Sequence, residues 1–175
     1  MGKLDIVTDE SGNKVVLLPE IIFSNKQNIN WDDVEDYLGK YVGELIEIAE
    51  TRDIIYIGNK FPDEYGGSSY TRKTKGARAK AKANAAQGIR EMVEIATDKV
   101  YRENHKEKHS EDVHNGWYYY VTRFAIPLYN NEKKTGEYNV YSACLVVNHA
   151  ANGKMYLYDV VDIKKEASNP LKTNK

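Results

Sequence analysis

Alternation of apolar and polar residues dominates the second half of the chain and predicts β-strands. Segments 117–129, 138–149 and 155–164 are rich in Val, Ile, Tyr and Phe, and a shorter segment at 99–103 precedes them. The pair Asn152-Gly153 between the last two segments is a strong turn signal. Four consecutive strands, the first two joined by the polar connector 105–115, predict an antiparallel meander.

The first half of the chain predicts a hairpin and a helix. Short apolar runs at 4–7 and 15–18 flank a polar turn, which is typical of a β-hairpin. Apolar residues then follow helical spacing over 31–50, and Asn30 directly before them is a good N-cap. Residues 53–58 predict one more short strand.

Between these parts, a loop and a second helix are expected. Residues 59–69 contain Pro and Gly and predict a loop, whereas the alanine-rich residues 76–97 predict a helix that can lie close to a sheet. Residues 167–175 have the composition of a frayed tail. The expected fold is therefore α+β, with an N-terminal hairpin and helices packed on a four-stranded antiparallel β-meander.

Side chains alternate along a strand, so each strand predicts two faces. Trp117, Tyr119 and Arg123 share one face of the first long strand, and Tyr156 and Tyr158 share one face of the third. If helices cover only the other face, these aromatic and cationic side chains form an open surface that can stack bases and hold phosphate. The alternative is a sandwich in which the hairpin and the first helix cover this face.

The length of 175 residues fits one domain, yet its charge is unevenly distributed. Residues 1–69 hold 6 Lys and Arg against 14 Asp and Glu, whereas residues 70–175 hold 19 against 12. We expect 1–69 to belong to the same compact unit as 70–171, with 172–175 as a tail. The basic part favours a polyanionic partner, unless the two parts pack together and neutralise each other.

The single cysteine, Cys144, lies in an apolar strand and predicts core packing rather than a disulfide or a nucleophile. Residues 1–9 do not resemble a signal peptide, and no apolar run approaches the ~20 residues that a membrane-spanning helix needs. The sequence therefore predicts a cytoplasmic protein without a membrane partner. It does not predict an oligomeric state.

Three histidines, His105, His109 and His114, lie close together in a polar connector. They allow a metal site with Glu111 or Asp112, but their spacing matches no zinc pattern and neighbouring lysines would repel a cation. We expect a solvated loop or a histidine acting as acid or base, and no metal or cofactor.

Metal-free cleavage of RNA needs a base, an acid and a cation beside the phosphorane. His149 at the end of the second long strand, the loop residue His109, Arg123 and Tyr119 are the candidate catalytic residues. Taken alone, His149 is also typical of a structural histidine. The sequence does not show whether these side chains converge.

A second group of residues is typical of nucleic-acid contacts rather than catalysis. Its members are cationic or aromatic: Lys75, Arg78, Lys82, Lys108, Tyr156 and Tyr158. The first three share one side of the alanine-rich helix, where a solvated helix edge is the alternative interpretation.

Several blocks resemble a segment of the large polyvalent protein-associated domains found in polyproteins of bacterial phages and conjugative elements. They are residues 70–87, 103–109, 116–127 and 157–166, and the resemblance covers about 54–171. It implies a relation to barnase–EndoU–colicin–RelE-like ribonucleases, although Asn148 stands where relatives would carry Arg.

Three hypotheses follow. The first is a mobile-element protein with a metal-independent ribonuclease-like domain acting on RNA. The second is a non-catalytic module that binds nucleic acid or a host defence or replication protein. The third is that the acidic residues 1–69 cover the basic face and hold it inactive.

Overall fold

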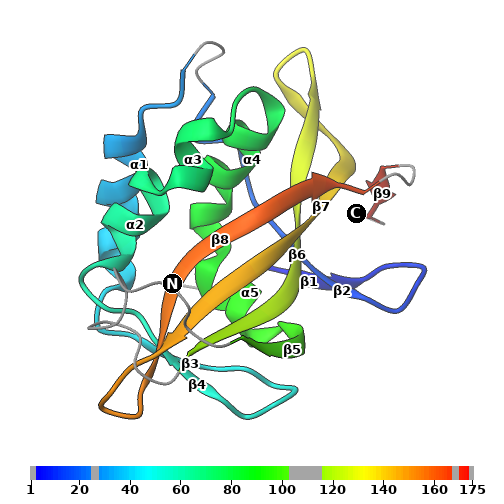
Figure 1. The fold of residues 1–175 in the computed structure, drawn as a ribbon. Coiled ribbons are helices and arrows are strands. Elements are labelled where there is room, and N and C mark those ends of the chain that lie inside the picture. The colour runs from blue at the N-terminus through cyan, green and yellow to red at the C-terminus, as the bar shows by residue number, and fades with distance from the viewer. Residues whose placement is uncertain (1–2, 25–27, 103–115, 167–169, 174–175) are drawn as a thin grey trace.

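The computed structural model of the protein describes residues 3–24, 28–102, 116–166 and 170–173. In these residues nine strands form one curled mixed sheet, with short helices against one of its faces (Figure 1). The strands are β1 (Ile6–Thr8), β2 (Lys14–Leu17), β3 (Leu45–Glu47), β4 (Ile54–Tyr56), β5 (Thr97–Arg102), β6 (Trp117–Asn130), β7 (Lys133–His149), β8 (Met155–Lys165) and β9 (Leu171–Lys172).

The four strands predicted in the second half are present as β5 to β8, and successive strands pair antiparallel. They form only the middle of the sheet, whose order is β1-β2-β6-β7-β8-β4-β3, with β5 also on β6 and β9 also on β7. The predicted fold class, helices and a hairpin packed on a four-stranded meander, is therefore wrong.

Long-range pairing explains the difference. The N-terminal hairpin forms as predicted, but β2 pairs in parallel with β6, where Val16 lies opposite Phe124. Likewise β4 pairs in parallel with β8, where Ile55 lies opposite Met155. Periodicity within a short window cannot reveal such partners, because each strand has the same pattern whichever strand it joins.

The helix predicted for residues 31–50 is too long. Helix α1 (Trp31–Leu38) is capped by Asn30 as expected and is followed by a single 3₁₀ turn at Gly39–Tyr41. The chain then turns at Gly43, whose φ of +94° is a conformation that favours glycine, and enters β3. The weak helix propensity of Gly39 and Gly43 therefore explains why the helix ends at Leu38.

The loop predicted for residues 59–69 is also wrong, because it contains helix α2 (Phe61–Gly67) and the start of α3 (Ser69–Lys73). Pro62 occupies the first turn of α2, where its missing N–H costs nothing. The side chain of Ser68 caps α3 by accepting from the Thr71 N–H. Two glycines and a proline thus mark helix ends here rather than a loop.

The alanine-rich helix forms but is interrupted. It consists of α4 (Ala77–Ala85), a 3₁₀ turn at Ala86–Gly88 and α5 (Ile89–Glu94). A Cβ at Gly88 would lie 3.1 Å from Leu18 Cδ2, so glycine permits close contact with the chain after β2. Small buried alanines along α4 bring it onto the sheet, as expected, and the main core lies between helices and sheet.

The curl of the sheet brings the β3–β4 turn against β6. Asp53 Oδ2 accepts from the Tyr120 hydroxyl at 2.7 Å and lies 2.8 Å from Lys99 Nζ. Burial alone would raise the pKa of Asp53, but hydrogen bonds from Lys99, Tyr120 and Thr51 outweigh it and lower the pKa. This polar cluster fixes the β3–β4 end of the sheet beside β5.

Candidate functional site

The face of β6, β7 and β8 that is turned away from the helices is called the outer face here (Figure 1). Alternation places Trp117 and Tyr119 of β6 on it, because Tyr120 and Phe124 point into the core. Tyr156 and Tyr158 of β8 also lie on it, because the buried Leu157 stands between them in the chain. Tyr56 of β4 lies on it as well, next to the buried Ile55. We call these five half-buried side chains, Tyr56, Trp117, Tyr119, Tyr156 and Tyr158, the aromatic band.

The rings of the aromatic band contact one another across strands. Trp117 and Tyr158 lie edge to face with centroids 5.0 Å apart, and Tyr56 and Tyr156 are tilted with centroids 5.7 Å apart. Register connects the two pairs, since Trp117 lies opposite Asn148 and Asn148 lies opposite Tyr156. The band therefore crosses neighbouring strands rather than following one.

A cation lies over a ring at each end of the band. The Arg102 guanidinium is 5.2 Å from the Tyr119 centroid, and Lys154 Nζ is 5.0 Å from the Tyr56 centroid. Both distances fall within the range of a cation–π contact. The ends of the aromatic band are thus positively charged.

The part of the outer face beyond Tyr119 is more neutral. Arg123 Nε donates to Glu166 Oε1 at 2.9 Å, so its charge is paired. Burial raises the pKa of the Tyr119 hydroxyl, with a smaller opposite effect from Arg102, so this phenol stays protonated at neutral pH. Burial, and to a lesser extent the charge of Asp162, raises the pKa of the Cys144 thiol to about 11. Neither Tyr119 nor Cys144 is prepared to act as a base or a nucleophile.

The structure does not bring the candidate catalytic residues together. Arg123 lies opposite Ser142, seven positions along β7 from His149, which corresponds to roughly 23 Å of strand. The two also occupy opposite faces: the His149 ring contacts Tyr118, on the helix side, with centroids 5.7 Å apart. His149 Nε2 lies 3.2 Å from the Gly153 carbonyl oxygen, a contact within its own turn. His109 lies outside the described residues.

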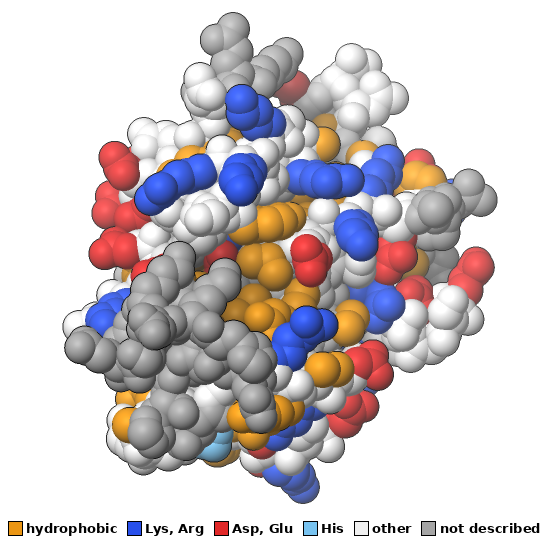
Figure 2. Space-filling model, in the orientation of Figure 1, with side chains coloured by type: hydrophobic (Ala, Val, Ile, Leu, Met, Phe, Trp, Pro, Cys, Tyr) orange, Lys and Arg blue, Asp and Glu red, His pale blue; other side chains and the backbone are white. Residues whose placement is uncertain are grey.

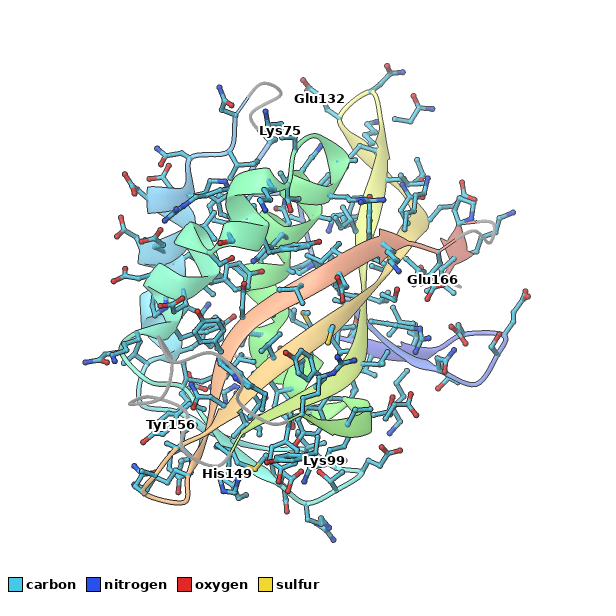
Figure 3. The ribbon with its side chains drawn as sticks, viewed as in Figure 1. Lys75, Lys99, Glu132, His149, Tyr156 and Glu166 are labelled. Carbon is cyan, nitrogen blue, oxygen red and sulfur yellow. The ribbon has the colours of Figure 1, made fainter. Side chains whose placement is uncertain are left out.

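The residues expected to contact phosphate separate into three groups. Lys75 and Arg78 are exposed, and Lys75 lies at the upper end of the helices (Figure 3). Lys82 is fully buried, with Nζ 2.6 Å from Asp159 Oδ1 and 2.6 Å from Thr71 Oγ1, so it cannot reach a phosphate in this conformation. Lys108 lies outside the described residues.

Lys82 instead forms a buried ion pair under β8. Its ammonium also lies 4.6 Å from the Tyr65 ring centroid, and Asp159 Oδ1 accepts from the Val160 N–H. Burial lowers the pKa of Lys82 and raises that of Asp159, and each charge counteracts the shift of the other. The helical spacing that placed Lys82 beside Lys75 and Arg78 did not reveal that this side of α4 faces the sheet.

Sequence reasoning missed several residues of the site. Arg72 and Lys73 are exposed in the last turn of α3, so four cations (Arg72, Lys73, Lys75, Arg78) gather at the α3–α4 junction. None of the four forms an ion pair with another described residue. Tyr56 joins the aromatic band only through the pairing of β4 with β8, and Arg102 and Lys154 lie over rings of the band only once the chain has folded. The density of Lys and Arg over 72–78 was the one signal visible in the sequence.

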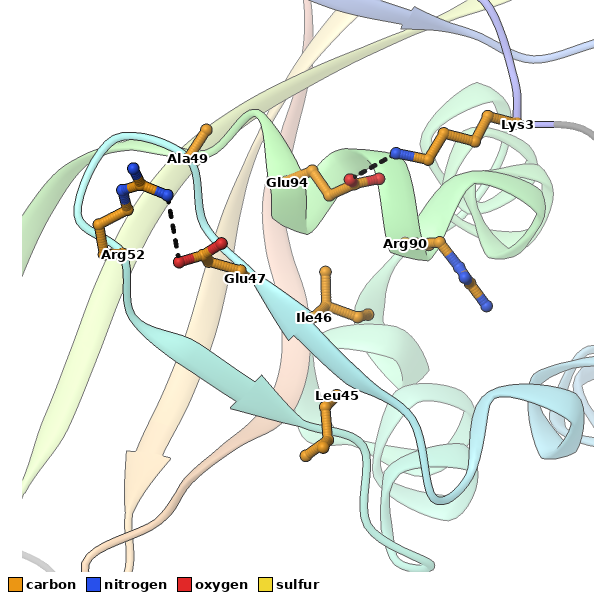
Figure 4. A pocket seen from close by; sticks show the side chains of 8 residues that line it. All are labelled: Lys3, Leu45, Ile46, Glu47, Ala49, Arg52, Arg90 and Glu94. Carbon is orange, nitrogen blue, oxygen red and sulfur yellow. Dashed lines mark hydrogen bonds and ion pairs between the residues drawn. The ribbon is translucent and has the colours of Figure 1, made fainter.

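A pocket of about 520 Å³ opens between β3 and α5 (Figure 4). Its cations are all paired: Lys3 with Glu94 at 2.8 Å, Arg52 with Glu47 at 3.5 Å, and Arg90 with Glu44. Because carboxylates already neutralise them, this pocket does not favour an anionic ligand.

The described part of the chain contains no cluster of His, Cys, Asp and Glu that would hold a metal ion. The three histidines of the polar connector lie outside it. Nor does any helix in this part have the length and apolar character needed to cross a membrane.

Comparison with known proteins identifies no relative of the chain. No family model matches the chain, no curated protein matches it, and no solved structure matches its fold.

Proposed function

We propose that the protein binds single-stranded nucleic acid, with bases on the aromatic band and phosphates on the surrounding cations. The observation that carries this proposal is the band itself: five half-buried rings on neighbouring strands, with a cation over the first and the last. Sheet surfaces that bind single strands combine these two elements, because every base has a π face and every nucleotide a phosphate.

Phosphate contacts are supported by the charge around the band. In the view of Figure 2, hydrophobic side chains occupy the centre of the outer face, and Lys and Arg side chains lie above and beside them. The four exposed cations at the α3–α4 junction have no carboxylate partner among the described residues, so their charge remains available. A backbone that extends from the band to Lys75 would reach these four cations.

Binding is favoured over cleavage by the positions of the titratable groups. A ribonuclease needs its acid, base and cation at one phosphate, whereas His149 and Arg123 lie on opposite faces. The half-buried phenol of Tyr119, whose pKa is raised, is suited to stacking rather than to proton transfer. An origin in a mobile element and a cytoplasmic location stay predictions from the sequence.

Fluorescence anisotropy with a labelled single-stranded oligonucleotide of about 12 nucleotides, in EDTA, tests the proposal. Loss of one stacking ring costs about 1–3 kcal/mol, so Tyr119→Ala and Tyr158→Ala should each raise Kd by about 5- to 150-fold. Tyr129→Ala is the matched control, because Tyr129 is an exposed tyrosine on β6 outside the band. Equal effects of all three substitutions, or no binding by the unchanged protein, would refute the proposal.

A salt series tests the phosphate contacts separately. Lys75→Gln and Arg78→Gln should each weaken binding and lower the slope of log K against log salt concentration by about 1. Lys133→Gln, at the start of β7, is the control and should leave the slope unchanged. A slope that falls equally in all three variants would mean that net charge alone attracts the nucleic acid.

A further inference from the structure

Strand β3 is the last strand at one end of the sheet, and its outer edge has no strand beside it in the described part of the chain. Its inner edge pairs with β4, and this pairing continues to Ile48, whose N–H donates to the Asp53 carbonyl. Hydrogen bonding alternates along an antiparallel pair, so Leu45 and Glu47 direct their N–H and C=O groups away from β4. The free edge therefore offers a donor and an acceptor at each of these two residues.

The free edge borders the pocket of about 520 Å³ described above. Lys3, Arg90 and Glu94 line this pocket on the side of β3 that faces away from β4, so it forms a groove between the edge and α5 (Figure 4). The groove is closed at one end, where the Ala49 N–H donates to the Glu94 carbonyl. Its volume lies within the range of about 300–1,000 Å³ that is typical of ligand sites.

The side chains at this edge do not protect it from pairing with another chain. Edge strands commonly carry Lys or Pro, which discourage such pairing, whereas β3 has the sequence Leu-Ile-Glu. Leu45 is 60% exposed, and Ile54 of β4, opposite Glu47, is 41% exposed. Because Ile46 points into the core, Leu45 lies on the outer face, where the side chain of an added strand would cover it.

We propose that this edge binds a short extended peptide segment of another protein, which adds to the sheet as a further strand beside β3. The backbone N–H and C=O groups of an extended chain complement those of Leu45 and Glu47. The cations that line the groove, Lys3, Arg52 and Arg90, are each paired with a carboxylate, so the groove favours a segment without net charge. Apolar side chains at alternate positions of the segment would cover Leu45.

A second copy of the chain fits this edge less well than a peptide does. Strand β3 has three residues, which correspond to about 10 Å of strand, whereas a stable dimer buries about 1,200–2,000 Å². Each copy would also bring its own α5 and its own ion pairs against the groove of the other. The groove has room for a single strand, which is what the proposal places in it.

Amide hydrogen exchange measured by NMR tests both the free edge and its occupant. In the protein alone, the Leu45 and Glu47 amides should exchange much faster than those of Ile46 and Ile48, which bond to β4. The probe is an uncharged, capped peptide of about six residues in which threonine and valine alternate. At about ten times its Kd, this peptide should slow exchange of the Leu45 and Glu47 amides by about 10-fold.

Two controls separate strand addition from general hydrophobic association. The same peptide with every backbone nitrogen methylated keeps its side chains but loses its donors, and it should not bind. Glu47→Pro removes one free N–H and should raise Kd by about 2- to 12-fold, the effect of one hydrogen bond, whereas Glu47→Ala keeps that N–H and should bind as before. Thr8→Pro, at the opposite edge of the sheet, and Tyr158→Ala, in the aromatic band, should also bind as before.

Slow exchange of Leu45 and Glu47 in the protein alone would overturn the inference, because the edge would then already be covered. Equal binding of the two peptides, no binding of either, or equal weakening by Thr8→Pro and Glu47→Pro would also overturn it. The peptide comparison needs no protein variant, so it decides the question even where Glu47→Pro does not fold. None of these outcomes affects the proposed function, which the oligonucleotide assay tests on its own.

Discussion

The buried pair of Lys82 and Asp159 gives the sharpest test of the fold. Lys82→Met deletes the ammonium and keeps a side chain of similar length in the core. It leaves the Asp159 carboxylate buried at 2% exposure with only the neighbouring N–H and hydroxyl groups to stabilise it. Removing one partner of a buried ion pair costs about 3–5 kcal/mol, because the remaining charge is neither solvated nor paired.

This cost is a large part of the stability of a domain, which is about 5–15 kcal/mol in total. For a chain of this length, 1 kcal/mol changes Tm by about 2–4 °C, so Lys82→Met should lower Tm by about 6–20 °C. The double variant Lys82→Met/Asp159→Leu should recover most or all of the loss, because it buries no charge. Far-UV circular dichroism during thermal and urea unfolding measures both effects.

Lys80→Met is the matched control, since Lys80 lies two positions earlier on α4, is partly exposed and has no ion pair with another described residue. We expect it to change Tm by little more than the error of the measurement. If Lys82→Met costs no more than Lys80→Met, or if the double variant is as unstable as the single one, Lys82 and Asp159 do not form a buried pair.

Three further predictions concern other parts of the fold. Asp53→Asn should lower the free energy of unfolding by about 1–3 kcal/mol at pH 7. Because the pKa of Asp53 is lowered in the folded protein, this difference in stability should shrink as pH falls below 3.8. A difference that stays constant between pH 7 and 2 would contradict the reasoning. Cys144, whose pKa is raised to about 11 from 9.0, should react with iodoacetamide at pH 8 about 100-fold more slowly than a free thiol, and a rate equal to that in urea would exclude its burial. Gly116→Ala places a Cβ 2.8 Å from the Arg102 carbonyl oxygen at a φ of +95°, so it should destabilise the protein by about 1–3 kcal/mol in urea unfolding. Gly136→Ala is the control and should cost less, because its φ is also positive but the space around its Cβ is open.

The sequence by itself determined the local elements whose pattern is strong. Alternation located β6, β7 and β8 within a few residues, and Asn30 marked the start of α1, because side-chain spacing and capping are local properties. The same alternation predicted which aromatic residues share a face. Trp117, Tyr119, Tyr156 and Tyr158 of the aromatic band were therefore visible before the fold was known.

Only the tertiary structure decided what surrounds those elements. It placed β2 and β4 in parallel beside strands about 100 residues away, which brought Tyr56 into the band and produced a nine-stranded sheet instead of a four-stranded meander. It also turned Lys82 into the core and His149 to the face opposite Arg123. A charge pattern cannot distinguish a lysine that meets phosphate from one that meets a buried carboxylate, because that depends on which element packs over it.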